Sequence, residues 1–340
     1  TSSSQGKGGS VLIDPETLTF TGDNFFPGQD REFEAENSIT IEDGAMLSTR
    51  KVASDTREAH LNAPSEGDSG NLTLRAPEVT VGEGAYILTF ADNGYQGGDI
   101  EIIAEDADRL GFNKEAHSLI NISGATLKGE NIRLRAMSDT SLLPGMSDDS
   151  PLPDPDEILD SVFGFSGDAV CTISEATAEI GIKGASLIEA EGEFYVYSKA
   201  LSKASPLTKM YMLAGAYGES NAVAKAYIEG TTKVNVGGNF TLAAESENVV
   251  NVNANSSSTN KPIDVTFSKA KVTTTTTAYI ANGVEVEANS VEVTANTVSD
   301  VSLSASAKET GASSTAVAVA INELETDTDC LLYTSPSPRD

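Results

Sequence analysis

The chain has 340 residues, with 51 acidic and 22 basic side chains and a formal net charge of −29. Such a negative surface repels nucleic acid and anionic lipid headgroups, so neither is expected as a general partner. Aromatic residues make up 6 % of the chain and Trp is absent, a composition that suits thin repeated layers better than a thick core of large side chains. The longest uninterrupted apolar run, residues 316–321, is far too short to span a membrane as a helix.

A five-residue pattern, apolar–any–apolar–any–Ala, recurs along the chain and predicts strands with one buried face. Successive side chains of a strand point to opposite sides, so alternation with a period of two separates a buried face from a solvated one. Thr, Glu, Arg, Asn and Ser occupy most of the positions expected to face outward. The copies begin at Leu72, Ile100, Ile132, Phe240, Val250, Val291 and Val301.

Two segments interrupt this alternation and are predicted to leave the repeated structure. Residues 51–70 are polar and irregular, and residues 144–160 hold four prolines, which lack the N–H that a strand ladder needs. We therefore divide the chain into an N-terminal β-helix segment (1–143), an acidic Pro-rich loop or linker (144–160) and a C-terminal β-helix (161–329).

The C-terminal part also contains a longer repeat of about 50 residues. Phe240 and Val291 are 51 positions apart (291 − 240), and "AYIEGTTKVNV" at Ala226 matches "AYIANGVEVEA" at Ala278 with an offset of 52 (278 − 226). A weaker copy lies at residues 178–200. Repetition of this kind is typical of a solenoid, in which each unit covers the hydrophobic face of its neighbour.

The period-two alternation and the many β-branched residues exclude a helical solenoid. Turns are expected at pairs such as Asp43-Gly44, Glu83-Gly84 and Asn282-Gly283, because Gly and Asn tolerate positive φ. Short strands, sharp corners and a sequence that repeats every couple of coils predict an all-β fold, a right-handed parallel β-helix or β-solenoid.

The last eleven residues, "CLLYTSPSPRD" (330–340), differ from the rest of the chain in composition. Their back-translation resembles a transposase sequencing adapter over all eleven codons, so we interpret this tail as non-native and exclude it from fold reasoning. The chain is then expected to be an internal piece of a longer product. Cys171 would be its only native cysteine, which excludes an intrachain disulfide.

The acidic loop is the main candidate for metal binding. Calcium takes six to eight oxygen ligands, and clustered aspartates can supply them. The spacing fits neither an EF-hand loop nor the nonapeptide of calcium-binding β-rolls, so a solvated linker is the favoured interpretation. The acidic residues concerned are Asp148, Asp149, Asp154, Asp156, Glu157 and Asp160.

The other reactive residue types give no constellation. His60 and His117 have polar neighbours and no second ligand at metal-binding spacing, so surface or turn positions are expected for both. Cys171 alternates with apolar neighbours and is expected to be a small buried hydrophobe. No residue is assigned a catalytic, cofactor-binding or metal-ligating role, no cofactor is expected, and calcium is the one ion left open.

An enzyme that acts on polysaccharides remains an alternative, because some parallel β-helices cleave acidic polysaccharides in a surface groove. Carboxylate pairs are everywhere in so acidic a chain and are uninformative by themselves. An interior groove lined by three or more carboxylates, or by a set of Arg and Lys side chains within hydrogen-bond reach, would favour this alternative. No nucleophile elbow, phosphate-binding loop or CxxC motif is present.

Several stretches resemble large bacterial exoproteins. "GGSVLIDPETLTF" (8–20) is similar to a phrase of filamentous haemagglutinin-like proteins, and "SGNLTLRAPEVTVGEGAYILTF" (69–90) resembles their β-helical coils. "TTTTTAYIANGVEVEANSVEVTA" (273–295) and "AVAVAINELETDT" (316–328) resemble the strand repeats of leukotoxin-type filamentous adhesins. The resemblance covers most of residues 8–328.

This resemblance implies a Gram-negative protein that is secreted or held at the cell surface in association with the outer membrane. Its β-helix would be a non-catalytic rod that presents binding regions to host-cell or surface ligands, glycans among them. Export would use an outer-membrane transporter or a C-terminal barrel of its own. A calcium-dependent surface-layer or biofilm matrix protein is the third alternative.

Overall fold

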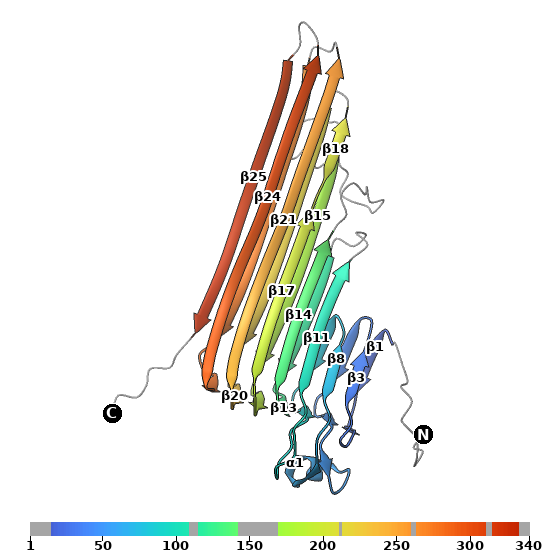
Figure 1. Ribbon diagram of the computed structural model, residues 1–340, viewed down its shortest axis with the longest axis vertical. Helices are drawn as coiled ribbons and strands as arrows, with labels where there is room; N and C mark the ends of the chain where they lie inside the picture. Colours follow the sequence, from blue (N-terminus) through green and yellow to red (C-terminus); the bar gives the residue numbers. More distant parts are fainter. Residues whose placement is uncertain are drawn as a thin grey trace, which may run out of the picture.

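The structure is a computed structural model of the chain and describes residues 15–108, 115–141, 169–210, 213–259, 263–310 and 315–332. It confirms the predicted parallel β-helix (Figure 1). Three parallel sheets, called here sheets A, B and C, run along the axis. Within the described residues seven coils contribute a strand to each sheet and an eighth contributes one to sheet A, and strands pair with their equivalents in the neighbouring coils.

Sheets A and C contain the strands that lengthen along the chain. Sheet A consists of β1 (Thr17–Phe20), β4 (Ser38–Ile41), β9 (Glu78–Val81), β12 (Glu115–Ser123), β15 (Ala169–Lys183), β19 (Leu213–Ile228), β22 (Ile263–Ile280) and β25 (Thr315–Leu332). Sheet C consists of β3 (Arg31–Glu34), β8 (Leu72–Arg75), β11 (Ile100–Asp108), β14 (Ile132–Ser141), β17 (Phe194–Ala204), β21 (Asn239–Thr259) and β24 (Ser290–Thr310). The short β18 (Leu207–Met210) follows β17 in the chain, and both strands pair with β21.

Sheet B keeps strands of three or four residues throughout. Its members are β2 (Asp23–Phe25), β5 (Met46–Ser48), β10 (Tyr86–Leu88), β13 (Thr126–Gly129), β16 (Leu187–Ala190), β20 (Lys233–Val236) and β23 (Glu285–Glu287). The coils therefore begin as small triangles and become broad, flattened loops whose long strands project away from sheet B (Figure 1).

A glycine with positive φ stands at the corner between sheets A and B in every coil. The chain turns sharply there, and a side chain would strain the left-handed backbone. The predicted turns at Gly44, Gly84 and Gly283 are confirmed by φ values of 68°, 68° and 98°. The complete set is Gly22, Gly44, Gly84, Gly124, Gly184, Gly230 and Gly283.

Most of the predicted inward positions form the core, but Val291, in the last described coil of sheet C, is exposed. Leu72, Leu74 and Ala76 are buried, and so are the matching residues of the patterns that begin at Ile100, Ile132, Phe240 and Val250. Phe194 and Phe240 stack in adjacent coils with ring centroids 5.0 Å apart. This main core runs the length of the axis inside all three sheets.

The expected coil length was wrong. The sequence repeat corresponds to one coil, not to a couple of coils, because Ala226 pairs directly with Ala278 and Phe240 with Val291. The patterns at Phe240 and Val250 lie on the same strand, β21, which has 21 residues. The coils of the C-terminal part consist of two long strands and one short strand, where short strands were expected throughout.

A buried line of small polar side chains, called here the polar seam, separates the main core from a second apolar cluster farther along the long strands. Ser202 Oγ lies 2.9 Å from Ser174 Oγ, and Ser220 Oγ lies 2.7 Å from both Ser202 Oγ and Asn248 Oδ1. Asn248 in turn donates to Thr274 Oγ1 at 2.6 Å. The second cluster consists of Ala204, Ala216, Val250, Val252, Ala254, Ala270 and Val272.

The segment 51–70 leaves the solenoid, as predicted. It forms an antiparallel pair, β6 (Lys51–Val52) with β7 (Ser65–Gly67), and the helix α1 (Arg57–Asn62) between them. Thr56 caps the helix by accepting a hydrogen bond from the Ala59 N–H at 3.3 Å. This helix, the only one in the described ranges, is not long and apolar enough to cross a membrane.

The predicted boundaries are only partly covered by the structure. Residues 142–168, which include the acidic Pro-rich loop, lie outside the described residues. Strand β25 ends at Leu332 and so includes the first residues of the tail 330–340, while residues 333–340 also lie outside.

Candidate functional site

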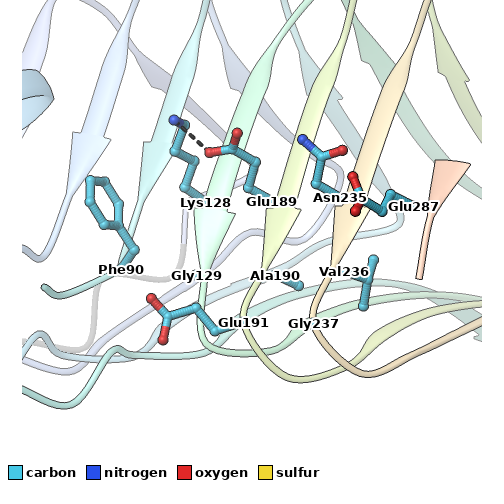
Figure 2. Close-up of a pocket in the computed structure, with 10 residues that line it drawn as sticks. All are labelled: Phe90, Lys128, Gly129, Glu189, Ala190, Glu191, Asn235, Val236, Gly237 and Glu287. Atoms are coloured by element: carbon cyan, nitrogen blue, oxygen red, sulfur yellow. Dashed lines mark ion pairs between the residues drawn. The ribbon is translucent and has the colours of Figure 1, made fainter. Parts of the chain in front are cut away.

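A surface groove of about 380 Å³ crosses four coils where sheet B turns into sheet C (Figure 2). Its long side is a row of four polar side chains on β13, β16, β20 and β23, and Phe90 lies at one end. Its lining residues are Phe90, Lys128, Gly129, Glu189, Ala190, Glu191, Asn235, Val236, Gly237 and Glu287.

The polar row is a direct product of strand register. Lys128 pairs with Glu189, Glu189 with Asn235, and Asn235 with Glu287, so each coil places one polar side chain at the same position. Adjacent strands are about 4.8 Å apart, and three such steps span about 14 Å. Figure 2 shows the four side chains side by side along the groove.

The floor of the groove is made of small and apolar residues at the corner. Gly237 N–H donates to Ala190 O at 2.9 Å, and a Cβ on Gly237 would lie only 2.2 Å from Glu191 O. The backbones of neighbouring coils thus approach too closely for a side chain at this point. Ala190 and Val236 flank it, but their side chains belong to the main core and are almost wholly buried.

The groove has an acidic balance. Lys128 Nζ makes an ion pair with a carboxylate oxygen of Glu189 at 2.5 Å, which leaves the carboxylates of Glu191 and Glu287 in excess. Burial raises the pKa of Glu191 above its ordinary value, and the nearby carboxylates of Glu130 and Asp92 raise it further. Three glutamates line the groove in all, but it lies at the surface, whereas an interior groove with three or more carboxylates was expected to favour a polysaccharide-active enzyme.

Phe90 connects the groove to a buried arginine behind it. The Arg50 guanidinium carbon lies 3.8 Å from the centre of the Phe90 ring, and Lys128 Nζ lies 5.9 Å from the same centre. Arg50 is 1 % exposed, makes an ion pair with Asp92 at 3.3 Å and donates to the backbone oxygens of His60 and Ala63. One side chain therefore holds both the end of the groove and the excursion 51–70.

The outer faces of sheets A and C carry tyrosine–glutamate pairs. Tyr197 Oη donates to Glu245 at 2.7 Å, and Tyr227 Oη donates to Glu179 at 2.7 Å. Burial, followed by the hydrogen bond to Glu245, raises the pKa of Tyr197 well above its ordinary value. These phenols stay protonated, and they bind neighbouring coils together across the outer surface.

His60 is not at the surface, and the expectation for it was wrong. Its side chain is fully buried and stacks on Phe25 with ring centroids 4.1 Å apart. Its Nδ1 lies 2.8 Å from Ser48 Oγ, and its Nε2 lies 3.7 Å from Asp55. Burial lowers the pKa of His60, and the carboxylate of Asp55 acts in the opposite direction. The polar neighbours that suggested exposure belong to the outer side of α1.

His117 and Cys171 lie apart from the groove and from each other. His117 is exposed on β12, as expected, with Glu78 at 3.7 Å. Cys171 is only half-buried, so the expectation of a fully buried cysteine was wrong. It lies at an odd position of β15, whose buried face is formed by even-numbered residues from Ser174 to Ile182.

The expected calcium-binding candidates, from Asp148 to Asp160, lie outside the described residues. Within the described ranges no group of three or more His, Cys, Asp or Glu side chains could hold a metal ion. The groove is not evident in the sequence, because its row combines residues of four coils. The only signal in the sequence is the offset of 46 to 61 positions between Lys128, Glu189, Asn235 and Glu287.

The chain matches no family model, no curated protein and no solved structure.

Proposed function

We propose that this chain is a segment of a large exported bacterial surface adhesin, in which the β-helix is a spacer that presents binding regions. Its role in this proposal is structural and adhesive, at the outer membrane or in secreted form. The observation that carries the proposal is that one sequence repeat builds one coil. Ala226 pairs with Ala278, and Lys233 with Glu285, both with an offset of 52.

A protein built in this way gains length without a new core, because each coil covers only its neighbours. The inward columns of small and apolar residues, the glycine corners and the outer tyrosine–glutamate pairs repeat with the coils. The sequence resemblance to filamentous haemagglutinin-like and leukotoxin-type adhesins agrees with this use of repetition. The long strands add a flat extension on one side. Seven spacings of about 4.8 Å make the axis about 34 Å long. The strand β21, which runs across the axis, has 21 residues and is therefore longer than the axis.

The spacer role is tested by lengthening the chain. We expect ten extra copies of the 52-residue unit, inserted in register after residue 280, to extend the axis by about 48 Å at constant width. Electron microscopy of negatively stained particles measures both dimensions. Aggregation, or growth in any direction other than the axis, would contradict the spacer role.

The adhesive role is tested separately. Beads coated with the chain should be retained on host-cell monolayers under flow more strongly than beads coated with the heat-unfolded chain. Equal retention of the two bead types would count against adhesion and leave the spacer role to stand on the length measurement alone.

A polysaccharide-active enzyme is the second candidate, favoured by the three glutamates in the groove and by the raised pKa of Glu191. A general acid for glycoside cleavage requires a carboxyl group with a raised pKa. Incubation with neutral and acidic oligosaccharides, followed by chromatography of the products, decides between the candidates. The adhesin proposal expects intact oligosaccharides, and Glu191-dependent shortening would replace it with the enzyme.

A further inference from the structure

The groove over sheet B has a repeat length of its own. Along the row from Lys128 to Glu287, equivalent side chains recur once per coil, about every 4.8 Å. An extended peptide places side chains of one face about 6.6 Å apart, twice its rise per residue, and therefore falls out of step with the row. A straight polysaccharide whose six-membered rings are linked through opposite ring positions advances by nearly one coil spacing per sugar. Its successive rings are turned over, so the row meets the two ring edges in alternation, and both edges carry hydroxyl groups.

The cross-section of the groove also fits a sugar ring. Ala190 and Val236 belong to the core and are only 4 % and 6 % exposed, so the floor is mainly the backbone at Gly237, over which the C–H face of a ring can lie. Glu189, Asn235 and Glu287 stand on one side, where hydroxyl groups at the ring edge would meet them (Figure 2). Phe90 limits one end of the groove with the face of an aromatic ring, a surface on which sugar rings stack through their C–H groups.

The charge of the groove selects among polysaccharides. Lys128 is already paired with Glu189, so the remaining charges are carboxylates, and a polyanionic chain would be repelled. Carboxylates accept hydrogen bonds from hydroxyl groups, and such charge-assisted bonds are stronger than neutral ones. The amide of Asn235 can both donate and accept. These groups suit a neutral chain of hydroxylated rings.

We propose that the groove over sheet B binds a neutral, linear polysaccharide that lies parallel to the helix axis with one sugar per coil. The inference rests on the proposed adhesin function, for which it names the class of ligand. The row of four polar positions would engage about three to four consecutive sugars, given the coil spacing.

Isothermal titration calorimetry of the 340-residue chain tests the proposal with three probes: cellohexaose, the hexamer of β-1,4-linked N-acetylglucosamine, and hexagalacturonate. We expect at least one neutral hexamer to bind and hexagalacturonate not to bind. Asn235→Ala and Glu287→Ala should each weaken the binding of the neutral hexamer by about tenfold, the effect of losing one or two hydrogen bonds.

The same two strands provide matched controls. Lys233 and Glu285 lie on β20 and β23 two residues before Asn235 and Glu287, point outward and do not line the groove. They form an exposed ion pair at 2.7 Å, which contributes little to stability. We expect Lys233→Ala and Glu285→Ala to leave the affinity for the hexamer within twofold.

Three results of the titrations with hexamers would overturn the proposal. These are no binding of either neutral hexamer to the folded chain, equal weakening by groove and control variants, and binding of hexagalacturonate as tight as that of the neutral hexamers. Binding of calcium chloride that the groove variants abolish, without binding of a hexamer, would also overturn it in favour of a cation site. Each of these results leaves the length measurement of the spacer unaffected, so the two proposals can fail independently.

Discussion

Alternation along each strand decides which side chains the fold depends on. Leu242 and Val293 occupy equivalent inward positions of β21 and β24, but Leu242 is fully buried whereas Val293 is only partly buried. Thr241 and Glu292, one position earlier on the same strands, face outward. The same column of inward side chains thus contains Leu242, which is fully enclosed, and Val293, which lies in the last coil of sheet C and is less covered.

The first prediction compares these neighbours. Leu242→Ala should lower the free energy of unfolding by about 2–5 kcal/mol, because it removes buried methyl groups and leaves a cavity. Thr241→Ala should change it by less than about 0.5 kcal/mol. Val293→Asp should cost several times more than Glu292→Lys, although less than an aspartate at position 242. Urea unfolding monitored by circular dichroism measures all of these variants, and similar costs within each neighbouring pair would contradict the assigned facing.

The second prediction concerns the buried histidine. Because burial holds the pKa of His60 below its unfolded value of 6.5, the unfolded chain binds a proton more readily than the folded chain. The contribution of His60 to the free energy of unfolding is therefore fully present above about pH 6.5, the pKa of the unfolded state. It is lost as the pH falls from there through the lower pKa of the folded state. Thermal melts should show that the melting temperature declines between pH 7.5 and 5.5, and that this decline is weaker in His60→Asn.

His117 is the control for this measurement, because it is exposed on β12. His117→Asn should retain the decline of the unsubstituted chain. If both variants follow the same pH profile as the unsubstituted chain, His60 does not titrate as its burial requires.

At the scale of the elements, Arg50 joins the excursion 51–70 to the coils. Its guanidinium donates to Ala63 O at 3.0 Å and to Ser65 Oγ at 3.4 Å, and it faces the ring of Phe90. The short helix α1 contributes only one buried side chain, His60. Arg50 is therefore one of the contacts that hold the excursion, beside the stacking of His60 on Phe25.

The third prediction follows from this contact. Arg50→Met should accelerate tryptic cleavage after Arg57, because the backbone carbonyl groups of the excursion lose their charged donor. The coils themselves should remain intact, as judged by circular dichroism. Arg133→Met is the matched control, since Arg133 makes a half-exposed ion pair with Asp99 on the outer face of β14. Equal cleavage rates in the two variants would remove Arg50 from this role.

The elements also show how far the sequence could be interpreted. The alternation at Leu72, Ile100 and Ile132 predicted the strands and their facing, and the Gly-containing pairs predicted the corners. The lengths of the later strands were missed because residues 245–248 separate two apolar patterns and read as polar loop sequence. In the structure Ser246 and Asn248 point inward and are hydrogen-bonded in the space between sheets A and C. A buried polar segment of a long strand has the composition of a turn.

The groove could not have been predicted from the sequence either, but the reason is different. Each of its row positions is an ordinary outward residue of a short strand, and only the stacking of four coils places them in line. The burial of His60 was missed likewise, since it depends on the contact of α1 with Phe25 and Ser48 in other parts of the chain.

For the whole molecule, the net charge of −29 is a source of self-repulsion. The fourth prediction is that the melting temperature rises when sodium chloride is raised from 0.01 M to 0.1 M, because the Debye length falls from about 30 Å to about 10 Å. Screening also weakens the surface ion pairs, but each contributes at most about 1 kcal/mol. Differential scanning calorimetry measures the shift, and an unchanged or lower melting temperature would contradict it. Calcium chloride at equal ionic strength should add no further rise unless a specific calcium site exists.

The widening of the coils has a consequence for assembly. The first strands of sheets A and C, β1 and β3, have four residues each, whereas the last ones, β25 and β24, have 18 and 21. Parallel strands of adjacent coils can satisfy their backbone groups only along the length that they share. A wide coil is therefore supported only by a neighbour of similar width, and the strands of sheets A and C reach their full length over several coils.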